Sequence, residues 1–128
     1  MPGAEAWDLI VVGGGAGGMG AARAARRRGA KVLLVQDGPI GGDCTFSGCV
    51  PSKALIAAAA RRDSFADAMA TVRGAVQTVA ASEDDDAFRG EGIDVMHGRA
   101  AFRSRHELEV EGRQVRAARV VIATGTRP

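Results

Sequence analysis

The sequence predicts an α/β domain built on a parallel sheet, with flanking helices and a small antiparallel β-meander. Three observations predict it. A strand, a glycine-rich turn, a helix and a second strand follow one another over residues 7–35. The second apolar run is as short as a buried parallel strand. Downstream, several short strand-like segments follow one another, and residues 111–113 form a turn between two of them.

The first half of the chain shows the βαβ pattern in detail. Residues 7–12 form an apolar run with β-branched side chains, and the alanine-rich residues 16–28 predict a helix that Gly29 closes with a left-handed cap. Residues 31–35 form the second strand. A glycine-rich loop is expected over 36–48, and the next helix is expected to open near Pro51, which a first turn tolerates because the missing N–H would lack a partner there.

The second half predicts a longer helix followed by strands. Ser64 is expected to cap that helix, and an acidic run over 83–86 is expected to end it. Apolar residues at helical spacing mark its expected buried face, namely Phe65, Met69, Val72, Val76 and Val79. Short strands are expected at 93–95, 100–103, 107–110 and 114–115, and a final strand at 119–123 leads into residues 124–128.

Length and composition exclude several classes of protein. A chain of 128 residues is one modest domain, small for an enzyme that holds a dinucleotide and two substrates, so it fits a piece of an enzyme better than a whole one. A net charge of +2 does not indicate a nucleic-acid partner. No apolar stretch approaches the roughly 20 residues of a membrane span, and the start lacks a secretory pattern. We therefore expect a cytoplasmic protein with no membrane partner, in which two cysteines are catalytic, metal-bound or merely buried.

The first chemical motif is a glycine-rich turn. Residues 13–18 match G-x-G-x-x-G between a strand and a helix, which is the context that dinucleotide binding requires. Gly13 would allow the sharp turn, Gly15 would let a pyrophosphate approach the backbone, and Gly18 would let the helix pack closely on the strand. The helix N-terminus would offer unpaired N–H groups to the phosphates. The alternative is that these glycines only make a flexible turn.

The end of the second strand is the expected ribose site. An acidic residue usually accepts hydrogen bonds from the ribose hydroxyls there, whereas this chain has Gln36 followed by Asp37. A glutamine oxygen accepts a weaker hydrogen bond than a carboxylate, and Asp37 substitutes if the strand ends one residue later. On this ribose role, Gln36→Glu is expected to hold or improve binding of the dinucleotide. The alternative is that Gln36 is a surface strand end.

The second motif, over residues 41–53, places Cys44 and Cys49 five positions apart at a helix entry. Five residues of regular helix rise about 7.5 Å, beyond the roughly 7 Å limit on the Cα separation of a disulfide, so the pair can bridge only where that turn is irregular. Gly48 and Pro51 are typical of such an entry, where the helix dipole would also stabilise a thiolate. The histidines, His97 and His106, lie far downstream, so no metal site is expected. Two inert buried thiols are the other alternative.

Together with the closing A-T-G-x-R-P, the two motifs carry a family resemblance that covers residues 7–128. The chain resembles the class I pyridine nucleotide-disulfide oxidoreductases, the family of dihydrolipoamide dehydrogenase, glutathione reductase and mercuric reductase. The resemblance implies a Rossmann-like FAD-binding domain in a homodimeric flavoprotein. It further implies that electrons pass from NADH or NADPH through FAD to the Cys44–Cys49 disulfide and on to a small-molecule or disulfide substrate.

The resemblance also implies roles for individual residues. Cys44 would be the interchange thiol that meets the substrate, Cys49 would lie against the flavin, and Lys53 would stabilise the reduced flavin. The remaining expected cofactor contacts are Gly41 and Gly42 beside the pyrophosphate with Asp43 and Cys44 next to them, the backbone of Ala100 at the adenine, and Thr124 and Gly125 along the cofactor. The alternatives are that Lys53 is a solvated helix residue and that Ala100 is only a strand residue.

The chain departs from the family pattern at two places. Gln36 replaces the usual glutamate, and residues 45–47, Thr-Phe-Ser, replace an aliphatic residue and an asparagine, so disulfide, lipoamide and metal-ion reduction all stay open as activities.

The expected organisation is a flexible start over 1–6 and the first segment of an FAD-binding domain over 7–128, with the nicotinamide and interface domains absent. The competing interpretations are an inert nucleotide-binding fragment or pseudo-enzyme, and a stand-alone NAD-binding dehydrogenase. The cysteine motif argues against the second, since a dehydrogenase has no use for a disulfide beside its dinucleotide.

Overall fold

The chain folds around one mixed sheet, seen here in a computed structural model that describes residues 4–127. The sheet has six strands in the order β3-β2-β1-β6-β5-β4. The elements are β1 (Glu5–Val12), α1 (Ala16–Arg27), β2 (Val32–Gln36), α2 (Gly42–Phe46), α3 (Cys49–Ala60), α4 (Phe65–Ser82), α5 (Asp85–Gly90), β3 (Asp94–His97), β4 (Ala100–Phe102), β5 (Glu107–Val110) and β6 (Arg113–Ile122). The predicted parallel sheet, flanking helices and antiparallel meander are confirmed.

The parallel strands lie at the centre of the molecule. β1 pairs in parallel with β2 on one side and β6 on the other, and β3 pairs in parallel with β2. Side chains of β2 alternate between two cores: Val32 and Leu34 pack in one, and Leu33 and Val35 in the other. Because both faces of β2 are covered, its apolar run is continuous rather than alternating.

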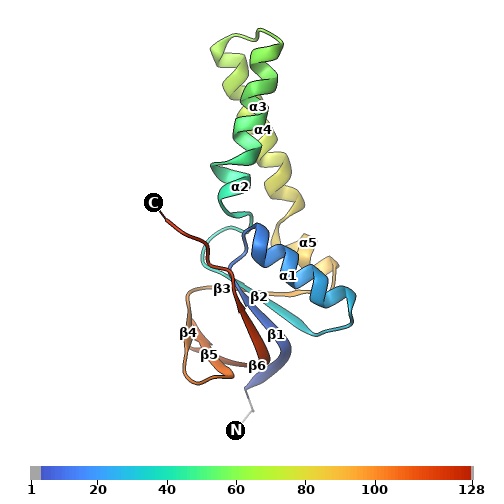
Figure 1. Cartoon of the computed structure of the whole chain (residues 1–128), viewed down its shortest axis with the longest axis vertical. Coiled ribbons are helices and arrows are strands. Elements are labelled where there is room, and N and C mark those ends of the chain that lie inside the picture. Colours follow the sequence, from blue (N-terminus) through green and yellow to red (C-terminus); the bar gives the residue numbers. More distant parts are fainter. Residues whose placement is uncertain (1–3, 128) are drawn as a thin grey trace.

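Different elements cover the two faces. Met19 of α1 and Phe88 of α5 pack on the face that bears Val32 and Leu34. The antiparallel strands β4 and β5 curl over the opposite face, where Leu108 packs with Trp7 (Figure 1). The helices α1 and α5 close one core, and the meander closes the other.

The last strand corrects one prediction. The segments 114–115 and 119–123 were expected as separate strands, but both lie in β6, which pairs antiparallel with β5 and parallel with β1. Arg116 interrupts the apolar run without interrupting the strand, because it points to the exposed side opposite Glu107, its partner in the ladder, at 3.6 Å. In this part of β6, buried Val115 and Ala117 alternate with exposed neighbours, as expected of a strand with one covered face.

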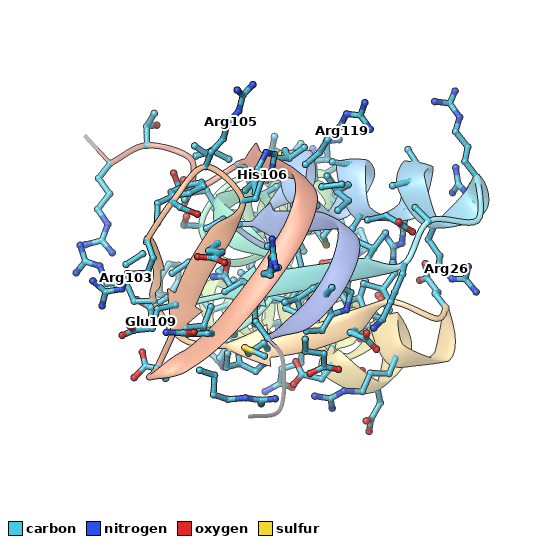
Figure 2. All side chains as sticks on the ribbon, turned by 90° about the horizontal axis from the view of Figure 1, so that it is seen from below. Arg26, Arg103, Arg105, His106, Glu109 and Arg119 are labelled. Atoms are coloured by element: carbon cyan, nitrogen blue, oxygen red, sulfur yellow. The ribbon has the colours of Figure 1, made fainter. Side chains whose placement is uncertain are left out.

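Charges on the meander are partly paired. Figure 2 shows Arg103 and Glu109 together at its edge, where they form an ion pair of 2.7 Å. Arg105 and Arg119 point outward from the sheet in the same view. Exposed pairs of this kind stabilise a fold little, so the meander is held by its apolar side.

Two short helices were missed by the sequence prediction. The segment 36–48, expected as a loop, contains α2. The acidic run 83–86 ends α4 as expected, but it also starts α5, because the Asp84 carboxylate accepts a hydrogen bond from the N–H of Ala87 at 2.9 Å. The expected cap at Ser64 is confirmed, since its hydroxyl accepts from the N–H of Asp67 at 3.2 Å.

Helices α3 and α4 pack on each other in a hairpin that projects away from the sheet, with α2 at its base (Figure 1). Of the expected buried face of α4, Val72 is buried, and Met69, Val76 and Val79 are half-buried. The expectation for Phe65 was wrong, because 81% of this residue is exposed at the start of α4. Phe65 is the first residue of α4, at the end of the hairpin that lies away from the sheet (Figure 1).

The ends of the chain need one further correction. Glu5 and Ala6, expected in a flexible start over 1–6, belong to β1 and pair with Val115 and Arg116. Residues 1–3 of that expected start lie outside the described residues. Between residues 4 and 127, none of the helices has both the length and the apolar character needed to cross a membrane.

Candidate functional site

A groove of about 1010 Å³ runs along the carboxyl-terminal edge of the parallel strands. Parallel strands all end at the same edge of a sheet, and ligands of open α/β folds bind there, where the order of strands reverses. Four strand ends supply the groove, and the segment that leads into α2 supplies the rest. Its lining is residues 12–17, 35–37, 42–44, 98–100 and 123–127.

Most of the sequence-predicted site residues line this groove. They are Gly13, Gly15, Gln36, Asp37, Gly42, Asp43, Cys44, Ala100, Thr124 and Gly125. Gly18, Gly41, Cys49 and Lys53 do not line it. The prediction missed Arg99 and Arg127, which bring positive charge to the groove. Their places in the loops that follow β3 and β6 are the signal that could have identified them.

The glycine turn is shaped by two close backbone approaches. Gly13 has a φ of +112°, and a side chain there would meet the carbonyl group of Ala123. A side chain on Gly18 would overlap the carbonyl oxygen of Gly13, and it would lie 3.4 Å from Cγ1 of Val11. These contacts match the sharp turn and the close helix packing that the motif predicts. Only glycine at 13 and 18 lets α1 start this near the end of β1.

The N-terminus of α1 presents unneutralised positive charge. Its N-cap is Gly15, which has no side chain to bind the first N–H groups, and its first turn contains no acidic residue. The basic residues Arg26 and Arg27 lie in the last turn. Free N–H groups and the helix dipole therefore favour an anion beside Gly15.

The segment before α2 supports the glycine turn from the other side. The N–H of Gly41 donates to the carbonyl oxygen of Gly14 at 2.8 Å, and Gly41 has a φ of +142°. At Gly42, with a φ of +68°, a side chain would come within 2.7 Å of the Cα of Gly15. The glycine turn and the segment before α2 therefore approach each other closely in the groove, because the glycines at this contact have no side chains. This leaves a surface that a pyrophosphate could approach closely.

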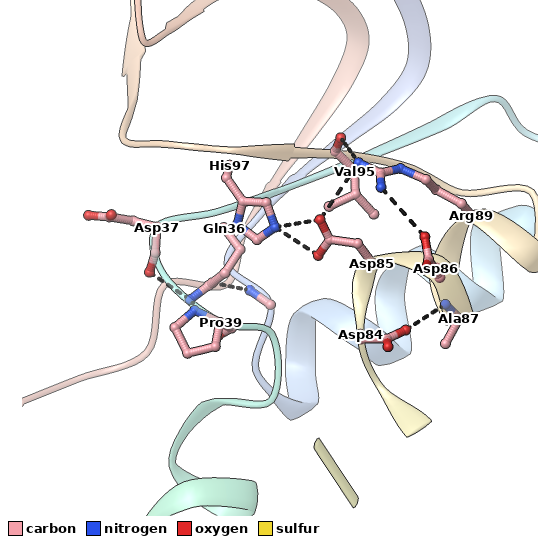
Figure 3. Close-up of polar contacts among 11 residues, drawn as sticks. Gln36, Asp37, Pro39, Asp84, Asp85, Asp86, Ala87, Arg89, Val95 and His97 are labelled. Atoms are coloured by element: carbon pink, nitrogen blue, oxygen red, sulfur yellow. Dashed lines mark hydrogen bonds and ion pairs between the residues drawn. The ribbon is translucent and has the colours of Figure 1, made fainter. Parts of the chain in front are cut away.

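Gln36 has a role inside the protein that its sequence did not reveal (Figure 3). Its Oε1 accepts from the N–H of Gly14 at 2.6 Å, and its Nε2 donates to the carbonyl oxygens of Asp37 at 2.9 Å and Pro39 at 3.3 Å. Both ends of the amide are therefore used to join the glycine turn to the segment after β2. Only an amide can both donate and accept in this way, since an ionised glutamate is acceptor-only.

These three hydrogen bonds, which form the Gln36 clamp, change the expected effect of substitutions at Gln36. Gln36→Glu loses both donated bonds and sets a charge against two carbonyl oxygens, so it should lower the free energy of unfolding by about 1–2 kcal/mol, as should Gln36→Leu, which loses all three bonds. Urea denaturation followed by circular dichroism measures this. Gln77→Glu, at an exposed position of α4, is the matched control and should have little effect. Equal stability of the Gln36 and Gln77 variants would contradict the clamp.

A second polar cluster lies next to Gln36 on the neighbouring strand. His97 pairs with Gln36 in the ladder of β2 and β3, and its Nε2 lies 2.7 Å from Oδ1 of Asp85. Arg89 lies 3.6 Å from the same carboxylate (Figure 3). The pair joins α5 to the edge strand and lies outside the lining of the groove. It therefore lies beside Gln36 without forming part of the groove.

The two cysteines lie on different helices. Cys44 is in the middle of α2, and Cys49 is the first residue of α3, whose N-cap is Gly48. The helical conformation is interrupted at Ser47 and Gly48, and Gly48 has a φ of −121° and a ψ of −109°. The irregular turn that a Cys44–Cys49 bridge requires is thus present. Cys49 also occupies the end of a helix where the dipole favours a thiolate.

Both cysteines are free thiols, Cys44 half-buried and Cys49 exposed. The pKa of the Cys44 thiol is raised, first by its side-chain hydrogen bond with Cys49 and then by desolvation, while the charge of Lys53 opposes the rise. The Cys49 side chain is therefore near enough to Cys44 to raise the pKa of its thiol, which keeps its proton to higher pH than an isolated thiol does. Lys53 acts on the pair from α3, one turn after Cys49.

Removal of Cys49 should lower the pKa of Cys44. In Cys49→Ala the main cause of the raised pKa is gone, so the pH midpoint for alkylation of Cys44 by iodoacetamide should fall. Lys53→Met should move the same midpoint upward, because it removes the cation that opposes the rise. Mass spectrometry of the reduced chain at a series of pH values measures both. A midpoint that is unchanged in both variants would show that the thiols do not interact.

Within residues 4–127, no three His, Cys, Asp or Glu side chains gather where they could hold a metal ion. The chemistry offered by the site is therefore that of a glycine-lined anion cradle with a dithiol at one end. An extended nucleotide and a thiol–disulfide reaction fit these features.

Comparison with known proteins agrees with this geometry. The family described as pyridine nucleotide-disulphide oxidoreductase matches residues 7–128. A glutathione reductase of Burkholderia cepacia is 34% identical over 95% of this chain and 31% of its own length, and a mercuric reductase of Streptomyces lividans is 36% identical over the same shares. The HOCl-induced flavoprotein disulfide reductase RclA from Escherichia coli superposes with a TM-score of 0.84 at 26% identity, over 97% of this chain and 30% of that one. The chain thus spans about a third of the length of these proteins.

Proposed function

Because the chain belongs to the pyridine nucleotide-disulphide oxidoreductase family, we propose that it is the FAD-binding part of a flavoprotein that reduces a substrate through Cys44 and Cys49. One observation carries the proposal: the glycine-lined groove at the carboxyl-terminal edge of the parallel strands includes Cys44, and Cys49 is near enough to that thiol to raise its pKa. A groove alone would fit a dehydrogenase. A cysteine pair alone would fit a thiol protein of any fold.

The residues of the groove fit FAD. The cradle formed by Gly13, Gly15 and Gly42 would hold the pyrophosphate, which the N-terminus of α1 would stabilise. Gln36 and Asp37 would lie at the ribose, and Gln36 has a further lone pair on Oε1 for a hydroxyl. The backbone of Ala100 would contact the adenine, with Arg99 beside it, and Thr124 and Gly125 would follow the cofactor along β6. When bound, FAD would supply hydride and electron transfer between NADH or NADPH and the dithiol.

The two thiols would have different roles. We assign the flavin-facing role to Cys49, because it lies at the N-terminus of α3 where a thiolate is stabilised, and the interchange role to Cys44, which keeps its proton to higher pH. In one cycle, two electrons and a proton leave the nicotinamide, the sulfur–sulfur bond breaks, and a second proton comes from solvent. The dithiol then returns both electrons and protons to a disulfide substrate, which becomes two thiols as the Cys44–Cys49 bond forms again.

The complete protein would need parts that act on the substrate and on the nicotinamide. We propose that residues 7–128 are the first segment of the FAD-binding domain and that the complete protein is a homodimer in the cytoplasm, where a nicotinamide cofactor and reduced thiols are present. The family match over residues 7–128, which covers 31% of the length of a relative, supports the first of these points. Small disulfides and metal ions are both candidate substrates, since the relatives include a glutathione reductase and a mercuric reductase.

The test is to purify the complete protein, release its cofactor by heat and identify it by fluorescence and chromatography. We expect FAD, and we expect NADH- or NADPH-dependent reduction of an artificial disulfide. FAD without turnover would favour the alternative of an inert nucleotide-binding protein. A bound nicotinamide dinucleotide in place of FAD would contradict the proposal.

A further inference from the structure

Thr45 is a buried threonine next to Cys44, and its hydroxyl donates a hydrogen bond to the carboxylate of Glu83, a residue distant in sequence. Within residues 4–127, Thr45 is the only polar residue in the buried class, with 3% of it exposed. Its Oγ1 donates to Oε2 of Glu83 at 2.9 Å, across 38 positions of sequence. A hydroxyl bonded to a carboxylate makes a stronger hydrogen bond than one bonded to a neutral acceptor. This bond is therefore a strong local constraint on the backbone next to Cys44.

The element that carries both Cys44 and Thr45 needs such a constraint. Helix α2 has five residues, too few for a helix to be stable by itself in water. It lies between the groove and the base of the hairpin, in contact with α3 and α4 (Figure 1). Glu83 is the residue that closes α4. The hydrogen bond thus joins the short helix of Cys44 to the end of the longest helix in the described part of the chain.

Glu83 also lies near a cation. The pKa of Arg23 on α1 is raised, first by its hydrogen bond to Glu91 and, to a smaller extent, by the charge of Glu83. The charge of Glu83 therefore acts on α1 while its carboxylate accepts from Thr45 on α2. Its carboxylate is half-buried there, so solvent competes less with the Thr45 hydroxyl than it would at an open surface.

Resting on the proposed function, we propose that Thr45 and Glu83 are positioning residues for Cys44. Their hydrogen bond holds α2 in the orientation that keeps Sγ of Cys44 within reach of Cys49. The aliphatic residue that the family pattern has at position 45 could not make this bond. The bond therefore gives Thr45 a structural role at a position where this chain departs from the common family pattern.

The test measures how strongly the fold favours the Cys44–Cys49 bond. The full chain is equilibrated with oxidised and reduced glutathione, so that one glutathione disulfide and the two protein thiols give two glutathione thiols and the protein disulfide. Thr45→Val removes the hydroxyl at nearly constant shape, and it should lower this equilibrium constant on the order of five-fold, the scale of one hydrogen bond. Thr45→Ser keeps the hydroxyl and should restore the constant to within about two-fold of the wild-type value.

Two further variants make the result specific. Thr78→Val is the matched control, because Thr78 on α4 bonds only the carbonyl oxygen of Gly74 in its own helix and lies far from the cysteines in sequence. It should leave the constant unchanged. Thr45→Val combined with Glu83→Ala should have no larger effect than either change alone, since both remove the same bond. If Thr45→Val does not fold, Glu83→Ala against Thr78→Val makes the same comparison, and Glu83→Ala should lower the constant because it removes the acceptor.

The outcomes separate this inference from the proposed function. Glutathione exchange requires neither flavin nor nicotinamide, so an absence of FAD or turnover in the complete protein would contradict the function without affecting this measurement. Equal constants for Thr45→Val and Thr78→Val, or additive effects at Thr45 and Glu83, would overturn the positioning role while leaving FAD binding intact.

Discussion

Replacing either Cys44 or Cys49 with serine should lower reduction of a disulfide substrate in the complete protein by about a thousandfold or more, the scale expected when a catalytic nucleophile is removed. A serine hydroxyl cannot form the disulfide through which the electrons pass, so neither half of the cycle can be completed. FAD should stay bound in both variants, because the glycine cradle expected to hold its pyrophosphate, formed by Gly13, Gly15 and Gly42, is unchanged in both. Steady-state kinetics with NADH or NADPH and the flavin absorbance of the purified proteins measure the two effects.

The control for the cysteine variants lies between the two cysteines. Ser47→Ala removes an exposed hydroxyl that bonds only the carbonyl oxygen of Asp43 at 3.3 Å, and it should keep most of the turnover. Retention of wild-type turnover in either cysteine variant would mean that electrons reach the substrate directly from the flavin. The dithiol would then have no part in the reaction.

Replacing Gly18 with alanine should destabilise the chain by about 3 kcal/mol or more and remove its affinity for FAD. The new Cβ would overlap the carbonyl oxygen of Gly13. That oxygen cannot move away easily, because the N–H of Gly13 is bonded to Val35 at 2.8 Å and Gly13 itself packs on Ala123. Overpacking of a rigid site costs about 1–3 kcal/mol, and the displaced turn also loses the anion cradle.

The matched control for this change is in the same helix. A Cβ on Gly20 would meet no atom within 4 Å, so Gly20→Ala should be neutral or stabilise the chain by about 0.5–1 kcal/mol, as expected for a helix interior. Thermal unfolding and titration with FAD compare the two variants. A Gly18→Ala chain as stable as Gly20→Ala would mean that the turn does not have the described geometry.

The elements that the sequence predicted well are those governed by local rules. The sequence predicted β1, α1 and β2 because apolar runs, a glycine turn and a glycine cap are each typical of one local structure. Gly29 has the expected positive φ of +86°. α2 was missed because five residues that begin with glycine show no helical period. α5 was missed because the acidic run was interpreted only as the end of α4, whereas Asp84 also caps the next helix.

The site shows the same division between local and distant contacts. Seven of the ten expected groove residues lie at or after strand ends, which a parallel sheet brings together, and Gly42, Asp43 and Cys44 join them from α2. The clamp of Gln36 on Gly14 could not be predicted, because its partner is a backbone N–H that carries no sequence signal. The bond between Thr45 and Glu83 could not be predicted either, since nothing local relates residues 38 positions apart.

The absorbance spectrum of the complete protein during anaerobic two-electron reduction tests whether the dithiol lies against the flavin. We expect a long-wavelength charge-transfer band between the Cys49 thiolate and FAD, because reduction opens the disulfide beside an oxidised flavin. The band should persist in Cys44→Ser and be absent in Cys49→Ser. A band that persists in Cys49→Ser and is lost in Cys44→Ser would reverse the two roles, and no band in the wild-type protein would contradict a dithiol held against the flavin.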